Sequence, residues 1–292
     1  MSAIRLALLT LVTMLCFAGN SVLCRLALRQ TSIDAASFTT VRLVSGALML
    51  VLLVYGRHHF RGVVSVASGR MNGLGGNWLS ALALFVYAAA FSFAYHKLST
   101  GIGALLLFGA VQATMILTGL WLGERLNTRQ VIGLLLALAG LVTILSPSLE
   151  APPLGSALLM LASGVAWGVY SLRGRGVADP TGETAGNFLR AALMSALLSG
   201  VLLAQQQLDT LGLLYAMLSG AVTSGLGYAI WYAVVPRLTR TRAATVQLSV
   251  PVLAALAGVL FVQEPITLRL LLTSAAVLGG IALVVLNKHT AV

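Results

Sequence analysis

The sequence has 292 residues, of which 59% are hydrophobic and only 9% are charged, and its formal net charge is +11. A water-soluble domain has about a quarter of its residues charged, so this composition excludes a soluble globule and predicts a protein whose solvent is lipid. The apolar runs are continuous rather than alternating, which predicts membrane-spanning α-helices and excludes a membrane β-barrel. The positive charges lie between these runs without interleaved aromatic residues, and they indicate membrane orientation rather than nucleic-acid binding.

Taken in chain order, the apolar runs predict ten membrane-spanning helices. About 20 residues cross the hydrocarbon region of a bilayer, and charges, prolines, glycines and helix-capping residues mark the boundaries. The predicted spans are residues 4–24, 34–55, 77–95, 100–122, 128–145, 155–172, 184–205, 211–235, 243–262 and 267–287. The first run is long for the apolar core of a signal peptide, so we interpret it as a span.

The distribution of Lys and Arg predicts the orientation of these spans. With the N-terminus inside, the inner segments hold 12 of these residues and the outer segments 4, while Arg42 and Arg190 fall inside spans. Cytoplasmic loops carry the excess of positive charge, so both termini are predicted to be cytoplasmic.

A Pro-rich link at residues 147–153 divides the ten spans five and five. Pro-rich segments act as semi-rigid spacers, which suits a joint between two halves. We therefore predict a first repeat at 1–147, a linker at 148–153 and a second repeat at 154–292. Because five is odd, the second half crosses the membrane in the opposite sense, and such inverted repeats are a transporter design.

One stretch occurs in both halves. The segment 122–129 matches the segment 262–269 when the sequence is shifted by 140 positions, so that Glu124 falls on Glu264. Each Glu precedes a helix start, and the favoured interpretation is a structural brace in which the carboxylate binds backbone N–H groups or the following Arg, Arg129 or Arg269. A role in gating is the alternative.

The acidic residues avoid the centres of the spans. All seven lie in loops or near helix ends: Asp34, Glu124, Glu150, Asp179, Glu183, Asp209 and Glu264. A proton-coupled antiporter usually keeps a carboxylate or His within the membrane, and the four His residues also lie at ends. The sequence therefore favours passive exchange or facilitated diffusion.

Aromatic and amide side chains within the spans are the candidates for substrate binding. Aromatic residues recur at helical spacing and predict an apolar cavity able to accept a ring, and buried amides need hydrogen-bond partners. The predicted substrate-binding residues are Asn20, Tyr87, Phe91, Gln112, Trp167, Tyr170, Tyr228, Tyr232 and Gln247. Packing or lipid-facing roles are the alternative for each of them.

Two arginines and one proline within spans are further candidates. An Arg inside the membrane is costly and normally faces protein or water. Arg42 and Arg190 are therefore possible anion contacts, although each lies near one end of its span and could instead bind helix-end carbonyls or extend to the interface. Pro251 should kink or unwind the ninth span.

The sequence gives no indication of a metal, a cofactor or an enzyme. Cys16 and Cys24 would lie about 12 Å apart along one helix, too far for a disulfide, and no metal-ligand spacing occurs. Nucleotide-binding loops and catalytic motifs of hydrolases and metalloproteases are also missing from the sequence.

The residues 122–133, followed by Ala139 and Gly140, resemble the signature of the EamA-type branch of the drug/metabolite transporter superfamily. Phe17, Gly19 and Asn20 in the first span and Arg42 in the second agree with this resemblance, whereas Pro265 and Leu268 depart from the pattern in the second copy. The chain more narrowly resembles the YddG-type exporters of aromatic amino acids. That implies ten helices around a central cavity, in a bacterial inner membrane.

The sequence thus predicts an all-α integral membrane protein that exports aromatic and other hydrophobic amino acids by alternating access. Its partners would be this small-molecule substrate and the lipid bilayer. An exporter of lipophilic cations or drugs, which aromatic rings also bind, is one alternative. An exchanger of organic phosphates or nucleotide sugars, with Arg42 and Arg190 as anion ligands, is another, and a scaffold or lipid-modifying protein is a third that the inverted repeat disfavours.

Overall fold

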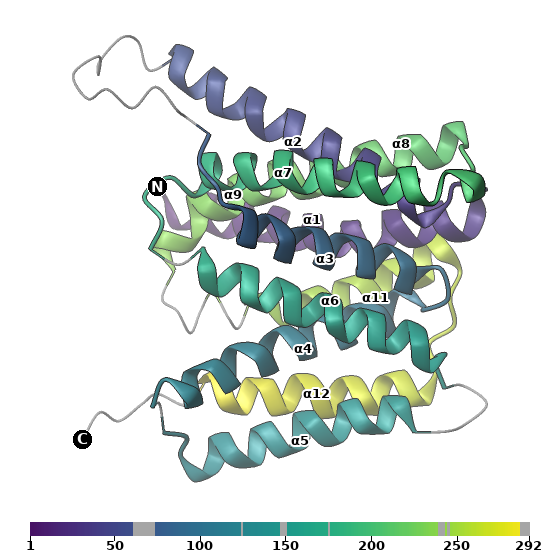
Figure 1. Ribbon diagram of the computed structural model, residues 1–292. Helices are drawn as coiled ribbons and strands as arrows, with labels where there is room; N and C mark the ends of the chain where they lie inside the picture. The colour runs from purple at the N-terminus through teal and green to yellow at the C-terminus, as the bar shows by residue number, and fades with distance from the viewer. Residues whose placement is uncertain are drawn as a thin grey trace.

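The computed structural model describes residues 1–60, 74–123, 125–146, 151–174, 176–238, 243 and 246–286. Within these residues the chain is entirely helical, without strands. Long apolar helices lie side by side along a common direction (Figure 1). The chain is an all-α integral membrane protein, because eight of the described helical segments are long and apolar enough to cross a bilayer.

The first half contains five helices. They are α1 (Ala3–Gln30), α2 (Ala35–Phe60), α3 (Trp78–Tyr95), α4 (Thr100–Trp121) and α5 (Thr128–Leu145). These correspond to the first five predicted spans, and the first extends six residues beyond its predicted end at residue 24. The extension carries Arg25 and Arg29 on the helix rather than in a loop, which matters for the closed end of the cavity described below.

The second half supplies the other five spans. They are α6 (Leu154–Arg173), α7 (Pro180–Val201), a composite span of α8 (Thr210–Leu218), η2 (Ser219–Leu226) and α9 (Gly227–Val234), α11 (Ser249–Val262) and α12 (Leu268–Leu286). Short 3₁₀ turns, η1 (Leu203–Gln205) and η3 (Val235–Arg237), follow α7 and α9. Of these spans, α7 is long but carries Glu183 and Arg190, and α11 has only 14 residues.

Side-chain caps fix several helix starts. Asn77 and Asp209 accept hydrogen bonds from the backbone N–H groups of Ser80 and Gly212, at the beginnings of α3 and α8. At α5, Asn127 and Gln130 form a reciprocal capping box. Such caps satisfy backbone donors that a helix end leaves free, so they set where each span begins.

The repeated stretch folds alike in its two copies. Gly123 has φ 92° after α4, and the matching Gln263 has φ 58° after α11, so both helices end in a left-handed turn. Glycine adopts this conformation without steric cost, whereas Gln263 is the only described non-glycine residue that does so. Glu264 directly follows this turn, and Glu124 lies outside the described residues.

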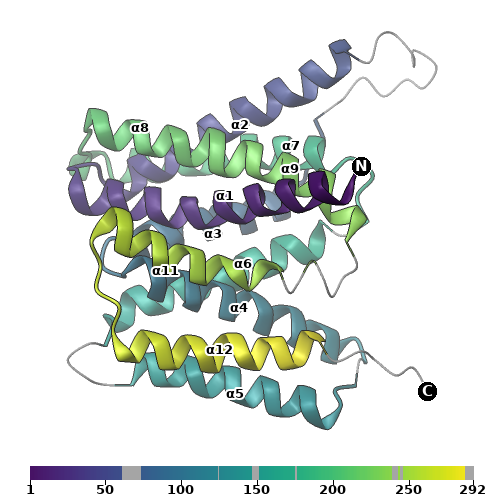
Figure 2. The ribbon, with the colours of Figure 1, turned by 180° about the vertical axis from the view of Figure 1, so that it is seen from behind.

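The helix contacts follow the order of the repeats. α2 packs on α7, α5 on α12 and α4 on α11, so three of the spans meet their counterparts five spans later. The contact of α3 with α6 corresponds to that of α8 and α9 with α1. The contact of α4 with α6 corresponds to that of α11 with α1. Exchanging the halves reproduces this pattern, as an inverted repeat requires. α5 and α12 form a pair at one edge (Figures 1 and 2).

Two irregular segments occur in the second half. The eighth span contains an eight-residue π-helix, η2, which the sequence analysis did not predict. The ninth span is interrupted at the turn residue Leu248, and Pro251 lies in the first turn of α11. A proline there removes no intrahelical hydrogen bond, so Pro251 helps to start α11 rather than bend its middle.

Candidate substrate cavity

A central cavity lies between six of the spans. Its volume is about 570 Å³, within the range of small-molecule sites, and α1, α3, α4, α6, the composite eighth span and the segment before α11 supply its walls. Eight of the nine predicted substrate-binding residues line it: Asn20, Tyr87, Phe91, Gln112, Trp167, Tyr228, Tyr232 and Gln247. The ninth, Tyr170, is buried and lines an adjoining lobe instead.

Aromatic rings form a continuous wall across this cavity. The Trp167 ring stacks on Tyr228 with centroids 5.3 Å apart and lies 4.8 Å from Tyr87. Tyr87 contacts Phe91 at 5.6 Å, while Phe17 contacts Tyr228 at 5.8 Å. The wall therefore joins four spans that are far apart in the sequence, and it offers flat apolar surfaces to a planar substrate group.

Asn20 is the centre of a hydrogen-bond network at the cavity wall. The Asn20 amide donates to the Tyr87 hydroxyl at 3.3 Å, and its carbonyl oxygen accepts from Ser219 at 2.5 Å and from Thr223 at 3.4 Å. Ser219 and Thr223 both belong to η2. The π-helix thus presents two hydroxyl groups to α1, in keeping with the frequent use of such segments at functional sites.

Arg42 extends this network from behind the aromatic wall. Its Nη2 donates to the Tyr87 hydroxyl at 2.8 Å, and its guanidinium lies 5.2 Å and 4.8 Å from the ring centroids of Tyr87 and Phe91. Only 1% of the residue is exposed. Arg42 therefore does not extend to the interface, and its charge is placed directly beneath two rings that line the cavity.

Arg190, the counterpart of Arg42 in the second half, is placed differently. Its Nη1 donates to the carbonyl oxygens of Gly75 and Gly186, both at 2.9 Å, and its guanidinium lies over the ring of Trp78. The backbone thus satisfies this charge outside the cavity lining. The binding of backbone carbonyls that the sequence offered as an alternative describes Arg190 and not Arg42.

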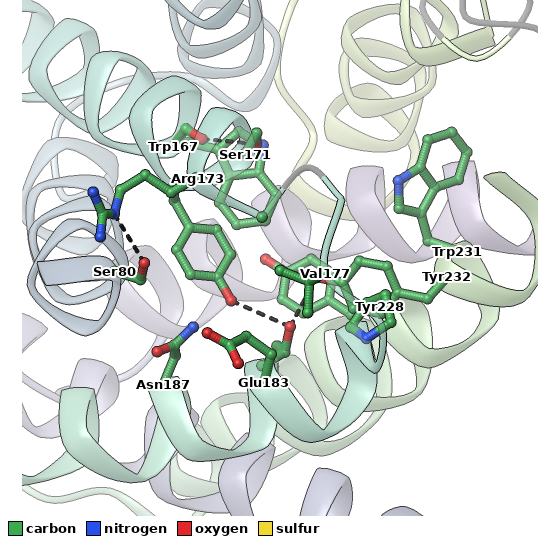
Figure 3. Close-up of a pocket in the computed structure, with 14 residues that line it drawn as sticks. Ser80, Trp167, Ser171, Arg173, Val177, Glu183, Asn187, Tyr228, Trp231 and Tyr232 are labelled. Atoms are coloured by element: carbon green, nitrogen blue, oxygen red, sulfur yellow. Dashed lines mark hydrogen bonds between the residues drawn. The ribbon is translucent and has the colours of Figure 1, made fainter. Parts of the chain in front are cut away.

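A smaller lobe of about 120 Å³ adjoins the cavity (Figure 3). Tyr170 and Tyr232 converge there on Thr184, with hydrogen bonds of 3.2 Å and 2.8 Å. Glu183 and Arg173 also line the lobe, and Arg173 donates to Ser80 at 3.0 Å. The lobe therefore contains charges of both signs, whereas the described lining of the main cavity contains no acidic or basic side chain.

The cavity reaches one face of the molecule. Its lining includes Gly174, Gly176 and Val177 in the link between α6 and α7, at the end where the N-terminus lies (Figure 1). At the opposite end, the ring of Phe91 packs on Tyr95, which is fully buried and donates its hydroxyl proton to the carbonyl oxygen of Thr100.

An ion-pair cluster lies over this closed end. Arg25 Nε donates to Glu264 Oε1 at 2.9 Å, and the other oxygen of Glu264 accepts from the backbone N–H of Thr100 at 2.7 Å. Arg25 also donates to the carbonyl oxygens of Tyr95 and His96. The Glu264 carboxylate thus ties α1, the α3–α4 link and the α11–α12 link together. We call this set Arg25, Tyr95, Thr100 and Glu264 the outer latch, after the orientation that the distribution of positive charge predicts.

In the second copy of the repeated stretch, Arg269 has partners other than the one that the sequence suggested. Arg269 does not pair with Glu264 but donates to the carbonyl oxygens of Thr143, Ile144 and Ser146 at the end of α5. Arg129 is exposed on the first turn of α5. The brace therefore involves distant elements, with Glu264 bound to α1 and Arg269 bound to α5.

Several cavity residues escaped the sequence analysis. Trp231, Phe108 and Thr223 line the cavity, and Arg25 forms the outer latch. Trp231 lies one residue before Tyr232 and could have been found from its position in an aromatic cluster. The pairing of Arg25 with Glu264, 239 residues apart, has no local signal.

Comparisons with known proteins agree with this architecture. The EamA-like transporter family matches residues 4–146 and 154–286, one match for each half. An uncharacterized protein of Pseudomonas aeruginosa is 57% identical over 280 residues, which cover 96% of this chain and 94% of that protein. An uncharacterized transporter of Archaeoglobus fulgidus is 29% identical over 196 residues, covering 65% of this chain and 70% of its own length.

A solved crystal structure shares the fold. It superposes with a TM-score of 0.67 at 21% identity, over 99% of this chain and all of the other. Two family matches, one on each five-helix half, together with a relative that is similar over nearly the whole length, settle the classification. This multi-pass membrane protein belongs to the EamA-like transporter family.

Proposed function

We propose that this protein exports aromatic and other hydrophobic amino acids by alternating access, without coupling to protons. The observation that carries the proposal is the aromatic-walled cavity, open to one face and covered at the other by the outer latch. Stacked rings favour a planar side chain, and the network around Asn20 supplies polar partners for the other end of a substrate.

The nine residues proposed to contact substrate are those predicted from the sequence, with Tyr170 acting in the adjoining lobe. The domain division at 148–153 is part of the same proposal, because two halves that move against one another need a joint between them. Residues 147–150 of this joint lie outside the described part of the chain.

The orientation of the termini decides which compartment the open cavity faces. If the N-terminus is cytoplasmic, the cavity is open to the cytoplasm, and the outer latch closes the path to the far side of a bacterial inner membrane. Six of the twelve positive residues assigned to the cytoplasm lie outside the described part of the chain: Arg61, Arg70, Arg175, Arg240, Arg242 and Lys288.

Purified protein in liposomes tests substrate and coupling together. Vesicles preloaded with unlabelled phenylalanine should accumulate labelled phenylalanine, and the initial rate should be the same with and without a pH gradient. The passive mechanism predicts this because no acidic side chain lines the described part of the main cavity. Uptake driven by an imposed pH gradient would contradict the mechanism, and absence of any exchange would contradict the substrate assignment.

The aromatic wall favours a second candidate, an exporter of lipophilic cations. Rings such as Trp167 and Tyr228 can bind a cation over their faces. Cells expressing the protein would then be protected from a cationic dye, whereas the amino-acid exporter would protect them from a toxic aromatic amino-acid analogue.

A further inference from the structure

Arg42 carries a buried charge that no acidic side chain in the described part of the chain neutralises. The residue is 1% exposed, and its Nε and Nη1 have no hydrogen-bond partner among the described residues. Its Nη2 bonds only the neutral hydroxyl of Tyr87. The ion pairs in the described part of the chain join Arg25 and Arg29 to Glu264 and Arg57 to Asp179, and none includes Arg42.

Such an arrangement is unfavourable unless something else completes it. A guanidinium remains protonated in proteins, and burying it without a counter-charge is costly. The rings of Tyr87 and Phe91 offset part of this cost through their faces, but they provide no acceptor for the two free N–H groups. The described residues therefore leave the positive charge of Arg42 without a counter-charge, and an anion nearby would supply one.

The Tyr87 hydroxyl connects this charge to the cavity. It accepts hydrogen bonds from Arg42 and from Asn20, and neither bond uses its own proton. That proton is left for an acceptor, and accepting from a cation makes the hydroxyl a stronger donor. Tyr87 and Asn20 both line the cavity, so a carboxylate placed there would bind the Tyr87 hydroxyl with the Arg42 charge behind it.

The cavity offers no equivalent group for a substrate ammonium. Its described lining contains no Asp or Glu, and the carbonyl oxygen of Asn20 already accepts from Ser219 and Thr223. Glu183 lies in the adjoining lobe together with Arg173, so the two charges there oppose one another. Of these charged groups, only Arg42 places an uncompensated charge beside the main cavity.

We propose that Arg42 makes the transporter selective for a carboxylate on its aromatic substrate, and that an α-ammonium is not required. This deepens the proposed function and depends on it. Aromatic carboxylates without an amino group then belong to the substrate range, and aromatic amines are excluded from it. A positive charge placed against Tyr87 would lie within reach of the guanidinium and be repelled by it.

Three compounds that share a phenylethyl group test this selectivity. Phenylalanine has both charges, 3-phenylpropionate has only the carboxylate, and phenethylamine has only the ammonium. In liposomes preloaded with unlabelled phenylalanine, each labelled compound is added outside at neutral pH, and protein-free liposomes give the background. We expect carrier-dependent exchange of phenylpropionate to be at least as fast as that of phenylalanine. Exchange of phenethylamine should be at least about tenfold slower than that of phenylalanine.

The substitutions Arg42→Gln and Arg42→Lys connect the selectivity to this residue. The ratio of phenylpropionate to phenethylamine exchange is the measurement, because it does not depend on the amount of folded protein. Arg42→Gln should lower the ratio at least tenfold, and Arg42→Lys, which retains the charge, should preserve most of it. Arg190→Gln is the matched control and should leave the ratio unchanged, since backbone carbonyls bind Arg190 outside the cavity lining.

A second variant covers the case in which Arg42→Gln does not fold. Tyr87→Phe keeps the ring and the guanidinium but removes the hydroxyl, and it should lower phenylpropionate exchange severalfold while phenethylamine exchange does not fall. Two outcomes would overturn the selectivity: preferred exchange of phenethylamine, or an exchange ratio that is unaltered in Tyr87→Phe and in a folded Arg42→Gln. Either outcome would remain compatible with an exporter of aromatic substrates. Exchange of none of the three compounds would overturn the proposed function and this inference with it.

Discussion

Glu264 illustrates how one side chain can hold an end of the molecule closed. Its carboxylate is 7% exposed, its partner Arg25 is 11% exposed, and both also bond the α3–α4 link, Glu264 through Oε2 and Arg25 through Nη1. Breaking a buried ion pair by removing one charge costs about 3 kcal/mol, because the other charge is left without its partner. The outer latch therefore contributes to the stability of the closed end.

The substitution Glu264→Gln should release the outer latch. Cys24 lies next to Arg25 and is fully buried, so its thiol reports opening of the closed end. In a Cys16→Ser background, an impermeant maleimide added from the outer face should label Cys24 at least tenfold faster in Glu264→Gln. Asp209→Asn, which removes an acid that caps α8, is the control and should not change the rate. Equal labelling in both proteins would exclude the gating role.

Trp167 joins three parts of the aromatic wall, since it contacts Tyr87, Tyr170 and Tyr228. Each aromatic pair contributes about 0.5–1.5 kcal/mol beyond its buried area. Trp167→Ala should therefore lower phenylalanine export about tenfold or more while the protein still reaches the membrane. Trp121→Ala is the control, because that ring is 86% exposed at the end of α4. Unchanged export by Trp167→Ala would remove the residue from the site.

Asp34 makes the stability sensitive to acid. Burial acts to raise the pKa of Asp34, but hydrogen bonds from Ser37, Gln207 and Ala36 outweigh it and hold the pKa below its ordinary value. A lowered pKa means that the carboxylate stabilises the folded protein above pH about 4, and that this contribution is lost as the pH falls through the folded-state pKa. Asp34→Asn should be less stable at neutral pH and should show a weaker loss of thermal stability on acidification.

At the scale of elements, the pairing of α5 with α12 rests on individual glycines. A Cβ added to Gly280 would collide with the backbone of Gly133 and Ala137, whereas one added to the neighbouring Gly279 would meet nothing within 4 Å. These two adjacent residues look equivalent in the sequence. Of these two glycines, only Gly280 lies where α5 and α12 approach closely.

Alanine substitutions at Gly279 and at Gly280 should therefore have different effects on stability. Gly280→Ala should destabilise the protein by about 1–3 kcal/mol, because a methyl group cannot fit without moving α5. Gly279→Ala should leave it as stable or raise its stability by about 0.5–1 kcal/mol, since alanine is the better helix former. Thermal unfolding in detergent measures both, and a similar loss in the two variants would refute the assigned packing.

The π-helix η2 is an element that could not be predicted from the sequence. Its sequence from Ser219 to Leu226 consists mostly of small residues, which permit close helix packing in a membrane. That role is present, since Gly220 lies against the backbone of Arg42. The change in helical winding that turns Ser219 and Thr223 toward Asn20 depends on neighbouring helices and leaves no periodic signal in the sequence.

At the scale of the whole molecule, the architecture could be predicted because it follows from composition and symmetry. Long apolar runs required helices, and the match of Glu124 to Glu264 required two related halves. The structure also gathers Tyr87, Trp167 and Gln112 in one cavity, as expected for polar and aromatic residues in mid-span. Arg42 and Arg190 could not be told apart, because their difference lies in which groups surround them in space.

The two faces of the protein differ in how deeply their ion pairs are buried. Arg57 and Asp179, at the open end, are 33% and 44% exposed and 2.7 Å apart, while the outer latch excludes most water. Dissolved ions weaken exposed ion pairs, but they screen buried pairs much less. Raising the ionic strength should therefore loosen the contact between α2 and the α6–α7 link and leave the opposite end shut, so that salt would act on one side of the transport cycle alone.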